Sequence, residues 1–443
     1  MQGTGRAWYF VGILVVLYAF SCIDRYILAL LVQPISAEFE LSDSIQGLML
    51  GAGFAVVYSL TGLPLAHLID RGDRRLIVAI GAILWGATTV ASGFAPNVET
   101  LVICRTGVAI GEAVLSPAAV SLISDLFPRE KRSLPVSMYV GTSQLMSVGS
   151  FVVSGAALDL ATHLSPDLHT APWRLTMMLV GLPSILVALL ILATVKEPPR
   201  KSELKESSDD SSLPAFLAHF RERIGLYGPT FLGVGCGAML GYGLVAWLPT
   251  LMVRTFDVSA QQAGYYLGIV GLAGGLSGAF GWPWIAKRFG KHDPITALMG
   301  CLIAAAAIGY VMAIIAANMT NMVLFLAFFT ACFMAIAAYA PIVPILIQTV
   351  APGRMHARLI SISFLCSNLI GFAIGPLLVP QFAKFWPDPQ AALGAGVATL
   401  AAVIAPVVIT CFAVGLRAAK AIKRREAQAQ AAPFAPAPEG GAV

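Results

Sequence analysis

Four ionisable residues interrupt two segments of the chain that are otherwise apolar. Asp24 and Arg25 stand side by side in one segment, and Arg105 and Glu112 lie two helical turns apart in another. A charged side chain at the centre of a bilayer costs about 2.5–3.5 kcal/mol, so four of them facing lipid would cost about 10–14 kcal/mol. Two acids and two bases placed together sum to zero charge, which makes an internal cluster tolerable. We therefore predict that all four side chains meet in one interior region facing a cavity.

These residue types suit two kinds of chemistry. A carboxylate within a membrane protein can take up and release a proton, and a guanidinium can hold an anionic group through parallel hydrogen bonds. We assign Asp24, Arg25, Arg105 and Glu112 to substrate binding or coupling, and the alternative is a purely structural network of ion pairs. The six histidines have no metal-ligand spacing and no HExxH motif occurs, so we predict neither a metal site, nor a cofactor, nor catalytic residues.

The composition shows where these residues must lie. Hydrophobic residues make up 58% of the 443 residues and charged residues 12%, and the mean hydropathy is +0.81. A soluble core could not be covered by so little polar surface. We predict an all-α membrane protein with twelve apolar runs long enough to cross about 30 Å of hydrocarbon, near residues 8–33, 44–68, 76–95, 98–124, 134–158, 173–195, 227–253, 260–285, 294–317, 321–350, 358–383 and 391–416.

The positions of the basic residues predict the orientation in the membrane. If both termini are cytoplasmic, the 28 Lys and Arg residues lie on the cytoplasmic side apart from two within spans, Arg25 and Arg105, and three outside, Arg174, Arg254 and Lys384. This is the positive-inside bias, so the formal charge of +5 reflects orientation and not nucleic-acid binding. The alanine-rich, loop-poor composition suggests a bacterial inner membrane, with the lipid bilayer as a partner and a single chain as the working unit.

A polar stretch near the middle of the chain divides six spans from six. It reads KEPPRKSELKESSDDSSLP, and the residues just after it, 215–224, are predicted to form a short amphipathic helix on the membrane surface. We predict an N-terminal six-helix bundle, a cytoplasmic linker, a C-terminal six-helix bundle and a disordered cytoplasmic tail, with these boundaries: 1–195, 196–225, 226–417 and 418–443.

The two halves also resemble each other. The stretches SPAAVSLISDLFPREKR and APIVPILIQTVAPGRMHAR each contain two prolines eleven residues apart followed by a basic turn, and Pro117 and Pro341 are 224 residues apart. A parallel repeat of six-span units is typical of the major facilitator architecture. At the same offset, the residues equivalent to Arg105 and Glu112 are Phe329 and Ile336.

The second half therefore offers a different wall to a cavity between the halves. No Asp, Glu, Lys or Arg stands in the central part of its spans. A cavity charged on one side and apolar or aromatic on the other suits an amphiphile, although a phenylalanine stripe is also ordinary packing. We predict that the cavity is lined by Tyr18, Ser116, Tyr242, Phe329, Phe333, Tyr339, Ser367 and Asn368.

Four stretches carry a resemblance to a known family. The loop GLPLAHLIDRGDRR, residues 62–75, is similar to the signature loop of major facilitator transporters, whereas its second copy, GAFGWPWIAKRFGKHD, has Ala286 in place of the acid. The DR pair at 24–25, with RTGVAIGEAVLSPAAVSLISDLF and WRLTMMLVGLPSILVALLILATVKEPPR, resembles the bacterial Spinster branch. The resemblance implies a transporter of lysophospholipids or sphingosine-type phosphates, with Asp24 and Glu112 as candidate protonation sites.

The expected function is alternating-access transport of an amphipathic, lipid-like anion, with Arg25 or Arg105 holding its headgroup and proton coupling left open. A proton-coupled organic-anion symporter and a drug/proton antiporter are the alternatives, and a membrane-embedded enzyme is the least favoured. We also predict a cytoplasmic gate of ion pairs, for which the alternative is the positive-inside bias alone, formed by Asp70, Arg71, Arg74, Arg75, Arg129 and Arg132.

Overall fold

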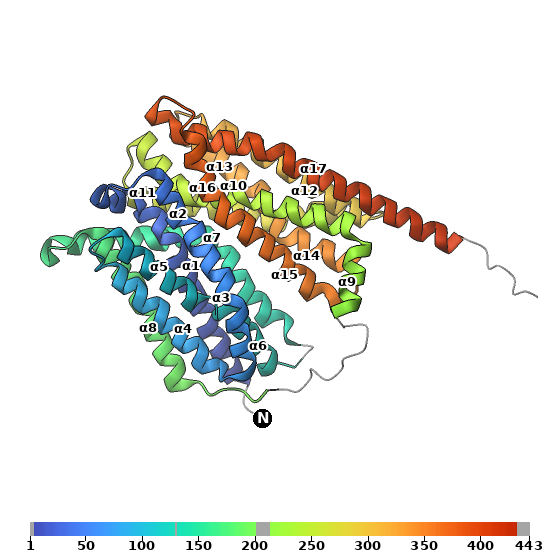
Figure 1. The fold of residues 1–443 in the computed structure, drawn as a ribbon, viewed down its shortest axis with the longest axis horizontal. Helices are drawn as coiled ribbons and strands as arrows, with labels where there is room; N and C mark the ends of the chain where they lie inside the picture. The colour runs from blue at the N-terminus through green and yellow to red at the C-terminus, as the bar shows by residue number, and fades with distance from the viewer. Residues whose placement is uncertain (1–3, 129–130, 201–212, 432–443) are drawn as a thin grey trace, which may run out of the picture.

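A computed structural model describes residues 4–128, 131–200 and 213–431 as helices joined by short turns (Figure 1). Parts of the predicted linker and tail, residues 201–212 and 432–443, lie outside the described residues, as does Arg129. The first half contains α1 (Thr4–Phe39), α2 (Asp43–Leu50), α3 (Ala52–Arg71), α4 (Arg74–Ser92), α5 (Val98–Glu112), α6 (Leu115–Leu126), α7 (Ser133–Leu168) and α8 (Pro172–Thr194).

The second half follows a short helix, α9 (Leu213–Glu222). It contains α10 (Ile224–Phe256), α11 (Ala260–Phe289), α12 (Pro294–Ala317), α13 (Met322–Ile336), α14 (Tyr339–Val350), the 3-10 turn η4 (Gly353–Met355), α15 (His356–Cys366), the π-helix η5 (Ser367–Phe372), α16 (Ala373–Ala383) and α17 (Pro389–Ala431).

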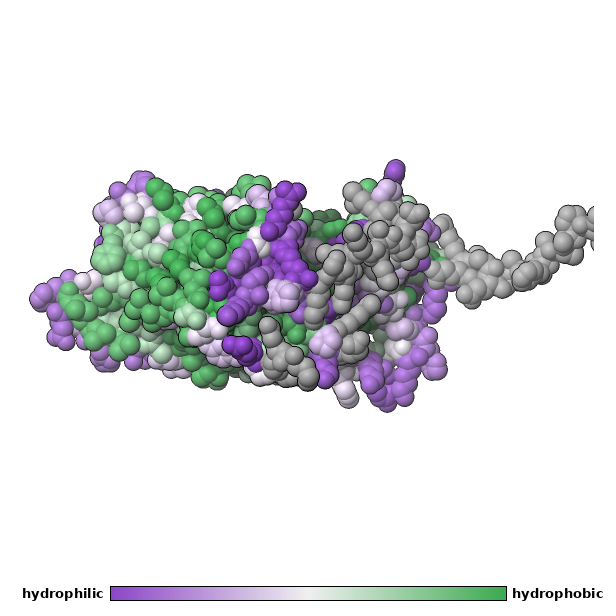
Figure 2. All heavy atoms as spheres, turned by 90° about the horizontal axis from the view of Figure 1, so that it is seen from below, coloured by the Kyte–Doolittle hydropathy of each residue, from purple (hydrophilic) through white to green (hydrophobic). Residues whose placement is uncertain are grey.

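Twelve helical segments are long and apolar enough to cross a membrane, which confirms the predicted number of spans. They form two six-helix bundles, which we call the N bundle (α1–α8) and the C bundle (α10–α17). Figure 2 shows apolar residues gathered over a broad area of one face, between hydrophilic residues at its left edge and a hydrophilic patch near the middle of the view. Such an apolar belt is what a bilayer requires of the surface that it covers.

The internal repeat predicted from the prolines is confirmed by the helix bounds. The α5–α6 pair starts, breaks, resumes and ends 224 residues before the α13–α14 pair does. Each pair is interrupted just before a proline, Pro117 or Pro341. Because proline has no N–H to donate, the carbonyl four residues earlier loses its helical partner, and the helix bends there. The two halves therefore share one backbone device.

The two ends of the spans differ in the segments that they carry. The linker end carries the turn at residues 72–73, the segment 195–200 and α9, and the opposite end carries the turns at 40–42, 94–97 and 257–259. Figure 1 shows the two bundles close together at the opposite end and diverging toward the linker end. Near the opposite end, α7 and α11 pack closely at Gly264, which has no side chain. A Cβ atom at this position would stand only 2.9 Å from the carbonyl oxygen of Phe151.

The predicted short surface helix is present as α9. Phe216 is 6% exposed, and its ring stacks on Phe220 with a centroid distance of 6.1 Å. Phe220 in turn stacks on Tyr227 of α10 at 5.8 Å. The apolar side of α9 is therefore covered by the C bundle, where the sequence had placed it against the membrane surface.

Candidate functional site

The four ionisable residues of the N bundle meet, as predicted, and they form two crossed pairs. Arg25 donates to the Oε2 atom of Glu112 from Nη2 at 2.6 Å and from Nε at 3.2 Å. The Nη1 atom of Arg105 lies 3.4 Å from the Oδ1 atom of Asp24 and donates to its backbone carbonyl at 3.2 Å. Thr89 of α4 donates a short hydrogen bond to the other Asp24 oxygen.

Helix geometry explains why neighbours in sequence take different partners. Consecutive residues of an α-helix point about 100° apart, so Asp24 and Arg25 leave α1 in different directions. Arg105 and Glu112 lie on one face of α5, about 10 Å apart along its axis. Asp24 therefore pairs with Arg105, and Arg25 pairs with Glu112, which lies two turns further along α5.

Burial divides the four residues into two groups. Asp24 is 0% exposed, Glu112 1% and Arg105 6%, whereas the side chain of Arg25 is 15% exposed. The guanidinium of Arg25 lies over the rings of Phe54 and Tyr58, each at 5.1 Å from the ring centroid. The expectation that all four face a cavity therefore needs correction, because Asp24, Arg105 and Glu112 are enclosed by the N bundle and only Arg25 among the four borders the small cavity described next.

A small cavity lies between the bundles beside Arg25. Its volume is about 10 Å³, which is roughly the space that one water molecule needs. The N bundle contributes side chains of α1 and α2, and the C bundle contributes α10 and η5; the lining residues are Arg25, Tyr26, Ala29, Leu50, Tyr242, Val245, Ala246 and Phe372. Arg25 is the one charged residue in this lining, and every lining residue from the C bundle is aromatic or aliphatic.

Two polar atoms of the cluster have no hydrogen-bond partner among the described residues. These are Oε1 of Glu112 and Nε of Arg105, both buried. A buried polar atom left without a partner costs about 1–3 kcal/mol. Atoms kept in that state are available to a water molecule, a proton or a ligand, which is why such groups accumulate at functional sites.

The predicted lining residues fall into three groups. Tyr242 lines the cavity, and the side chain of Ser367 lies within hydrogen-bonding distance of the side chain of Tyr242. Tyr18 and Ser116 both contact Tyr139 of α7, Tyr18 by ring stacking at 4.6 Å and Ser116 by a hydroxyl contact at 3.4 Å. These two residues lie inside the N bundle.

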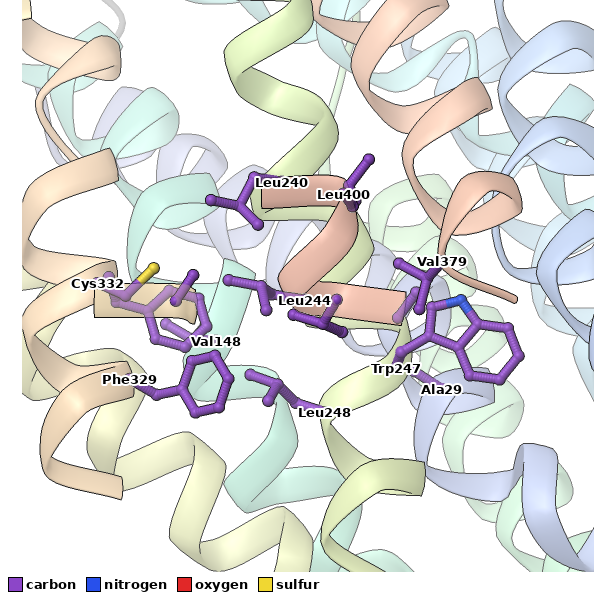
Figure 3. Packing of buried hydrophobic residues seen from close by; sticks show 14 of the residues in the cluster. Ala29, Val148, Leu240, Leu244, Trp247, Leu248, Phe329, Cys332, Val379 and Leu400 are labelled. Atoms are coloured by element: carbon purple, nitrogen blue, oxygen red, sulfur yellow. The ribbon is translucent and has the colours of Figure 1, made fainter. Parts of the chain in front are cut away.

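The remaining predicted residues lie within the C bundle. Phe329 is 0% exposed and packs edge-on against Phe325 at 4.7 Å, and Figure 3 shows it pointing toward Leu248 of α10. Phe333 is also buried there, and Tyr339 is half-buried with its hydroxyl oxygen enclosed. Asn368 donates to the carbonyl of Phe364, one turn earlier in the same span. Their role as cavity lining stays a prediction.

Sequence reasoning missed several residues that do line the cavity. Tyr26 follows Arg25 directly, so its position was recoverable from the DRY sequence. Phe372 ends the π-helix η5, where the backbone departs from the α-helical period. Because periodicity arguments assume 3.6 residues per turn, they give no signal for a residue placed by a π-helix.

Comparison with known proteins decides the family. The model of the Major Facilitator Superfamily matches residues 14–376, most of the chain. The chain belongs to the major facilitator superfamily. An MFS-type efflux pump of Mycolicibacterium smegmatis is 29% identical over 419 residues, covering 91% of each chain. The sphingosine-1-phosphate transporter SPNS2 of Xenopus tropicalis is 24% identical over 387 residues, covering 83% of this chain and 72% of that protein.

A solved structure supports the same fold. It is a bacterial homolog of the human lysosomal transporter Spinster, in an inward-facing and unoccupied conformation. Its TM-score is 0.82 at 23% sequence identity, with 98% of this chain and 100% of that chain covered. The predicted resemblance to Spinster within the superfamily is therefore confirmed, and the family and fold support a transport role.

The signature loop of the superfamily forms a polar network inside the N bundle. Arg74 is 2% exposed and binds Asp125 at 2.5 Å, Glu197 at 2.7 Å and Ser121 at 2.9 Å. Asp125 and Glu197 were not predicted, because the acids that pair with this arginine lie far from it in sequence. Arg200 also donates to the carbonyls of residues 69 and 72 at the end of α3.

The other predicted gate residues make contacts within the N bundle. Asp70 and Arg71 are exposed, Arg75 donates to the carbonyl of Val195, and Arg132 donates to that of Phe127. A gate requires contacts across the two bundles in another conformation of the transporter. The gate of Asp70, Arg71, Arg74, Arg75, Arg129 and Arg132 therefore stays a prediction.

Polar side chains hold the bundles together at the opposite end. Arg254 of α10 binds Asp43 of α2 through two hydrogen bonds of 2.7 and 2.9 Å, and its Nε donates to Gln33 of α1 at 3.3 Å. Gln381 of α16 donates to Ser44 at 3.1 Å. We call the Asp43–Arg254 pair the latch. These contacts join the two bundles at the opposite end.

Proposed function

We propose that this protein is an alternating-access transporter of an amphipathic anion of the lysophospholipid or sphingosine-phosphate type. The carrying observation is the cavity between the bundles, where Arg25 faces Tyr242, Val245, Ala246 and Phe372. A single cation on one wall suits a phosphate headgroup, and an apolar second wall suits a hydrocarbon tail. The similarity to a relative named as a sphingosine-1-phosphate transporter supports this substrate class.

Entry of such a substrate requires movement of the bundles. A space of about 10 Å³ admits little more than water, so the bundles must separate before a lipid-sized molecule can bind. The latch closes the opposite end, and the bundles diverge toward the linker end. The linker end is basic, so in this proposal it is cytoplasmic and the structure is inward-facing. Both termini are then cytoplasmic.

Proton coupling follows from competition for Arg25. Glu112 is its present partner, and an anionic substrate would take the same guanidinium. Release of Glu112 leaves a buried carboxylate without its cation, which favours proton uptake. Substrate binding and protonation of Glu112 are thereby linked. Glu112→Gln, which is neutral, should abolish pH-driven uptake in proteoliposomes while leaving substrate exchange, and an unchanged pH dependence would remove Glu112 from this role.

The decisive experiment measures binding of a lysophospholipid to purified protein. Arg25→Gln should weaken binding by about tenfold or more, because a hydrogen bond to a charged group contributes about 1.5–3 kcal/mol. The matched control is Arg288→Gln, an exposed arginine of α11. A neutral monoacylglycerol should bind equally to wild type and to Arg25→Gln. Equal lysophospholipid affinity in all three proteins would contradict the proposal.

Export of drug-like molecules is a second candidate function. It is favoured by one observation, the 29% identity to an MFS-type efflux pump along 91% of the chain. A drug/proton antiporter would move cationic or neutral dyes, and Arg25 would repel the cations. Dye export that persists in Arg25→Gln, together with no lysophospholipid binding by wild type, would favour this candidate; transport of a short carboxylate alone would favour an organic-anion symporter.

A further inference from the structure

A second and much larger cavity lies at the linker end of the C bundle. Its volume is about 470 Å³, within the range of sites that bind small molecules. Residues of α10, α12, α14 and α17 surround it, and no described residue of the N bundle contributes to its lining. It is therefore separate from the cavity beside Arg25.

The depth of this cavity in the membrane follows from the span bounds. Arg223 precedes the span that begins at Ile224, and Asp293 precedes the span that begins at Pro294. Val350 ends another span, and Lys423 is the penultimate residue of the last one. Four span ends meet here, so the cavity lies at the boundary between the hydrocarbon and the headgroups.

Basic side chains line the polar side of the cavity, and their positions are fixed by contacts. Arg223 donates to the carbonyl of Val350 at 2.8 Å, and the Nζ atom of Lys423 lies 3.3 Å from Asp293. His292 adds a third basic side chain. Among the described lining residues, two cations stand against one carboxylate, so this side carries a net positive charge before His292 is counted.

Asp293 is the one acidic residue among the described residues of the lining, and its charge already has partners. It accepts hydrogen bonds from the backbone N–H and the hydroxyl of Thr296, at 3.3 and 2.8 Å, besides contacting Lys423. Burial alone would raise the pKa of Asp293, but these hydrogen bonds and the ammonium of Lys423 lower it below its usual range. Asp293 therefore caps α12 and orients Lys423, and it does not cancel the attraction of the cavity for an anion.

The other side of the cavity is aliphatic. Leu226 is 2% exposed and Ala419 4%, and Ile295 and Ile422 are half-buried beside them. Inorganic phosphate would occupy only the polar side and would leave this wall in water. A molecule that carries both an anionic group and a hydrocarbon chain would contact both sides.

We propose that this cavity binds an anionic phospholipid from the leaflet at the linker end. Its phosphate lies between Arg223, Lys423 and His292, and one acyl chain lies along Leu226, Ile295 and Ile422. A zwitterionic lipid is disfavoured because its own cation would meet the same basic side chains. The site does not depend on which substrate is carried between the bundles, and it places a lipid contact on the C bundle alone.

The test is native mass spectrometry of the purified full-length protein in detergent, titrated with phosphatidylglycerol or phosphatidylcholine. Wild type should hold phosphatidylglycerol more tightly than phosphatidylcholine. Lys423→Gln should weaken phosphatidylglycerol binding by about fivefold, the usual effect of one basic residue at an anionic lipid surface. The control is Lys420→Gln, an exposed lysine of the same helix that does not line the cavity. Equal losses in the two variants would overturn the site, because surface charge alone would then explain binding.

A second variant tests the apolar side without changing charge. Ile422→Trp fills part of the cavity and should reduce the number of tightly bound phosphatidylglycerol molecules by one. Unchanged occupancy in this variant, or equal displacement of the lipid by glycerol phosphate and inorganic phosphate, would overturn the proposal. Arg25→Gln should retain full lipid occupancy even if it abolishes substrate binding, so the two proposals fail separately. Thermal unfolding curves of each variant show whether it is folded.

Discussion

The N and C bundles share one backbone arrangement and differ in the side chains at their centres. The broken pairs α5–α6 and α13–α14 have matching bounds 224 residues apart. Within this frame, Arg105 and Glu112 bind charged partners on α1, while their equivalents in the C bundle are Phe329, packed against Phe325, and Ile336. The repeat therefore conserved the geometry of the helix break, and the chemistry of the two walls diverged.

The charged cluster of the N bundle and the apolar packing of the C bundle also stabilise their bundles differently. Buried aromatic and aliphatic side chains contribute steadily through packing. A buried ion pair adds little net stability, since desolvation of both charges offsets their attraction, but it becomes very costly when one partner is lost. The N bundle should therefore respond sharply to single changes in its cluster, and the C bundle should respond in proportion to the volume removed.

The largest effect is expected from Glu112→Ala. This change leaves the largely enclosed guanidinium of Arg25 without its anion. Loss of one partner from a buried pair costs about 3–5 kcal/mol. Thermal unfolding in detergent measures the loss. The double variant Arg25→Met with Glu112→Leu should recover much of it, because two apolar side chains replace the whole pair. If the double variant is no more stable than Glu112→Ala alone, ordinary packing and not unpaired charge explains the cost.

A smaller effect is expected at the equivalent depth of the C bundle. Phe329→Leu removes part of one ring from a well-packed core and should cost about 1–2 kcal/mol, short of the 3–5 kcal/mol typical of truncation to alanine. Because Phe329 does not line the cavity beside Arg25, substrate affinity should remain unchanged. A binding titration of the folded variant checks this. Weaker binding would place Phe329 in the substrate site, as the sequence predicts.

Equivalent helix caps should make similar contributions in the two bundles. Asp73 accepts a hydrogen bond from the N–H of Leu76 at 2.9 Å, and Asp293 accepts one from that of Thr296 at 3.3 Å. Asp73→Ala and Asp293→Ala should each cost about 1 kcal/mol, the usual value of an N-cap. A large difference between them in thermal unfolding at neutral pH would show that the halves are not equivalent at this turn.

The contribution of Asp293 to the free energy of unfolding should change with pH in one direction. The pKa of this carboxyl is lowered in the folded protein by its hydrogen bonds and by Lys423. Its contribution is therefore complete above the unfolded-state pKa of about 3.9 and is lost as the pH falls through the lower folded-state pKa. The stability difference between wild type and Asp293→Ala should shrink only in that acidic range. A loss between pH 5 and 7 would point to another group.

The smallest effect is expected where the bundles meet. Both side chains of the latch are about one-third exposed, Arg254 at 30% and Asp43 at 35%. Such a pair contributes about 0.5–1 kcal/mol, so Asp43→Asn should raise the population open at the opposite end by about two- to fivefold. On a cysteine-free background, a membrane-impermeant thiol reagent should then label Ala29→Cys faster. Asp257→Asn, another exposed acid at that end, is the control, and equal labelling in both would exclude the latch.

The spans, their repeat and the convergence of the four charges were predictable from the sequence for one physical reason. Hydrocarbon thickness fixes the length of an apolar run, and the cost of a charge in lipid forces such residues inward. Pro117 and Pro341 marked the repeat because proline constrains the backbone locally. These are constraints that each segment obeys by itself.

Only the tertiary structure decided which charge pairs with which, which of them borders the cavity, and what stands opposite. Arg25 differs from Arg105 in exposure because Phe54, Tyr58 and the C bundle surround them unequally. Phe372 reaches the cavity through a π-helix, and Arg74 binds Asp125 of α6 and Glu197 of the segment after α8, both distant in sequence. Such contacts depend on how helices rotate and pack against one another, and that rotation is set by all of their neighbours at once.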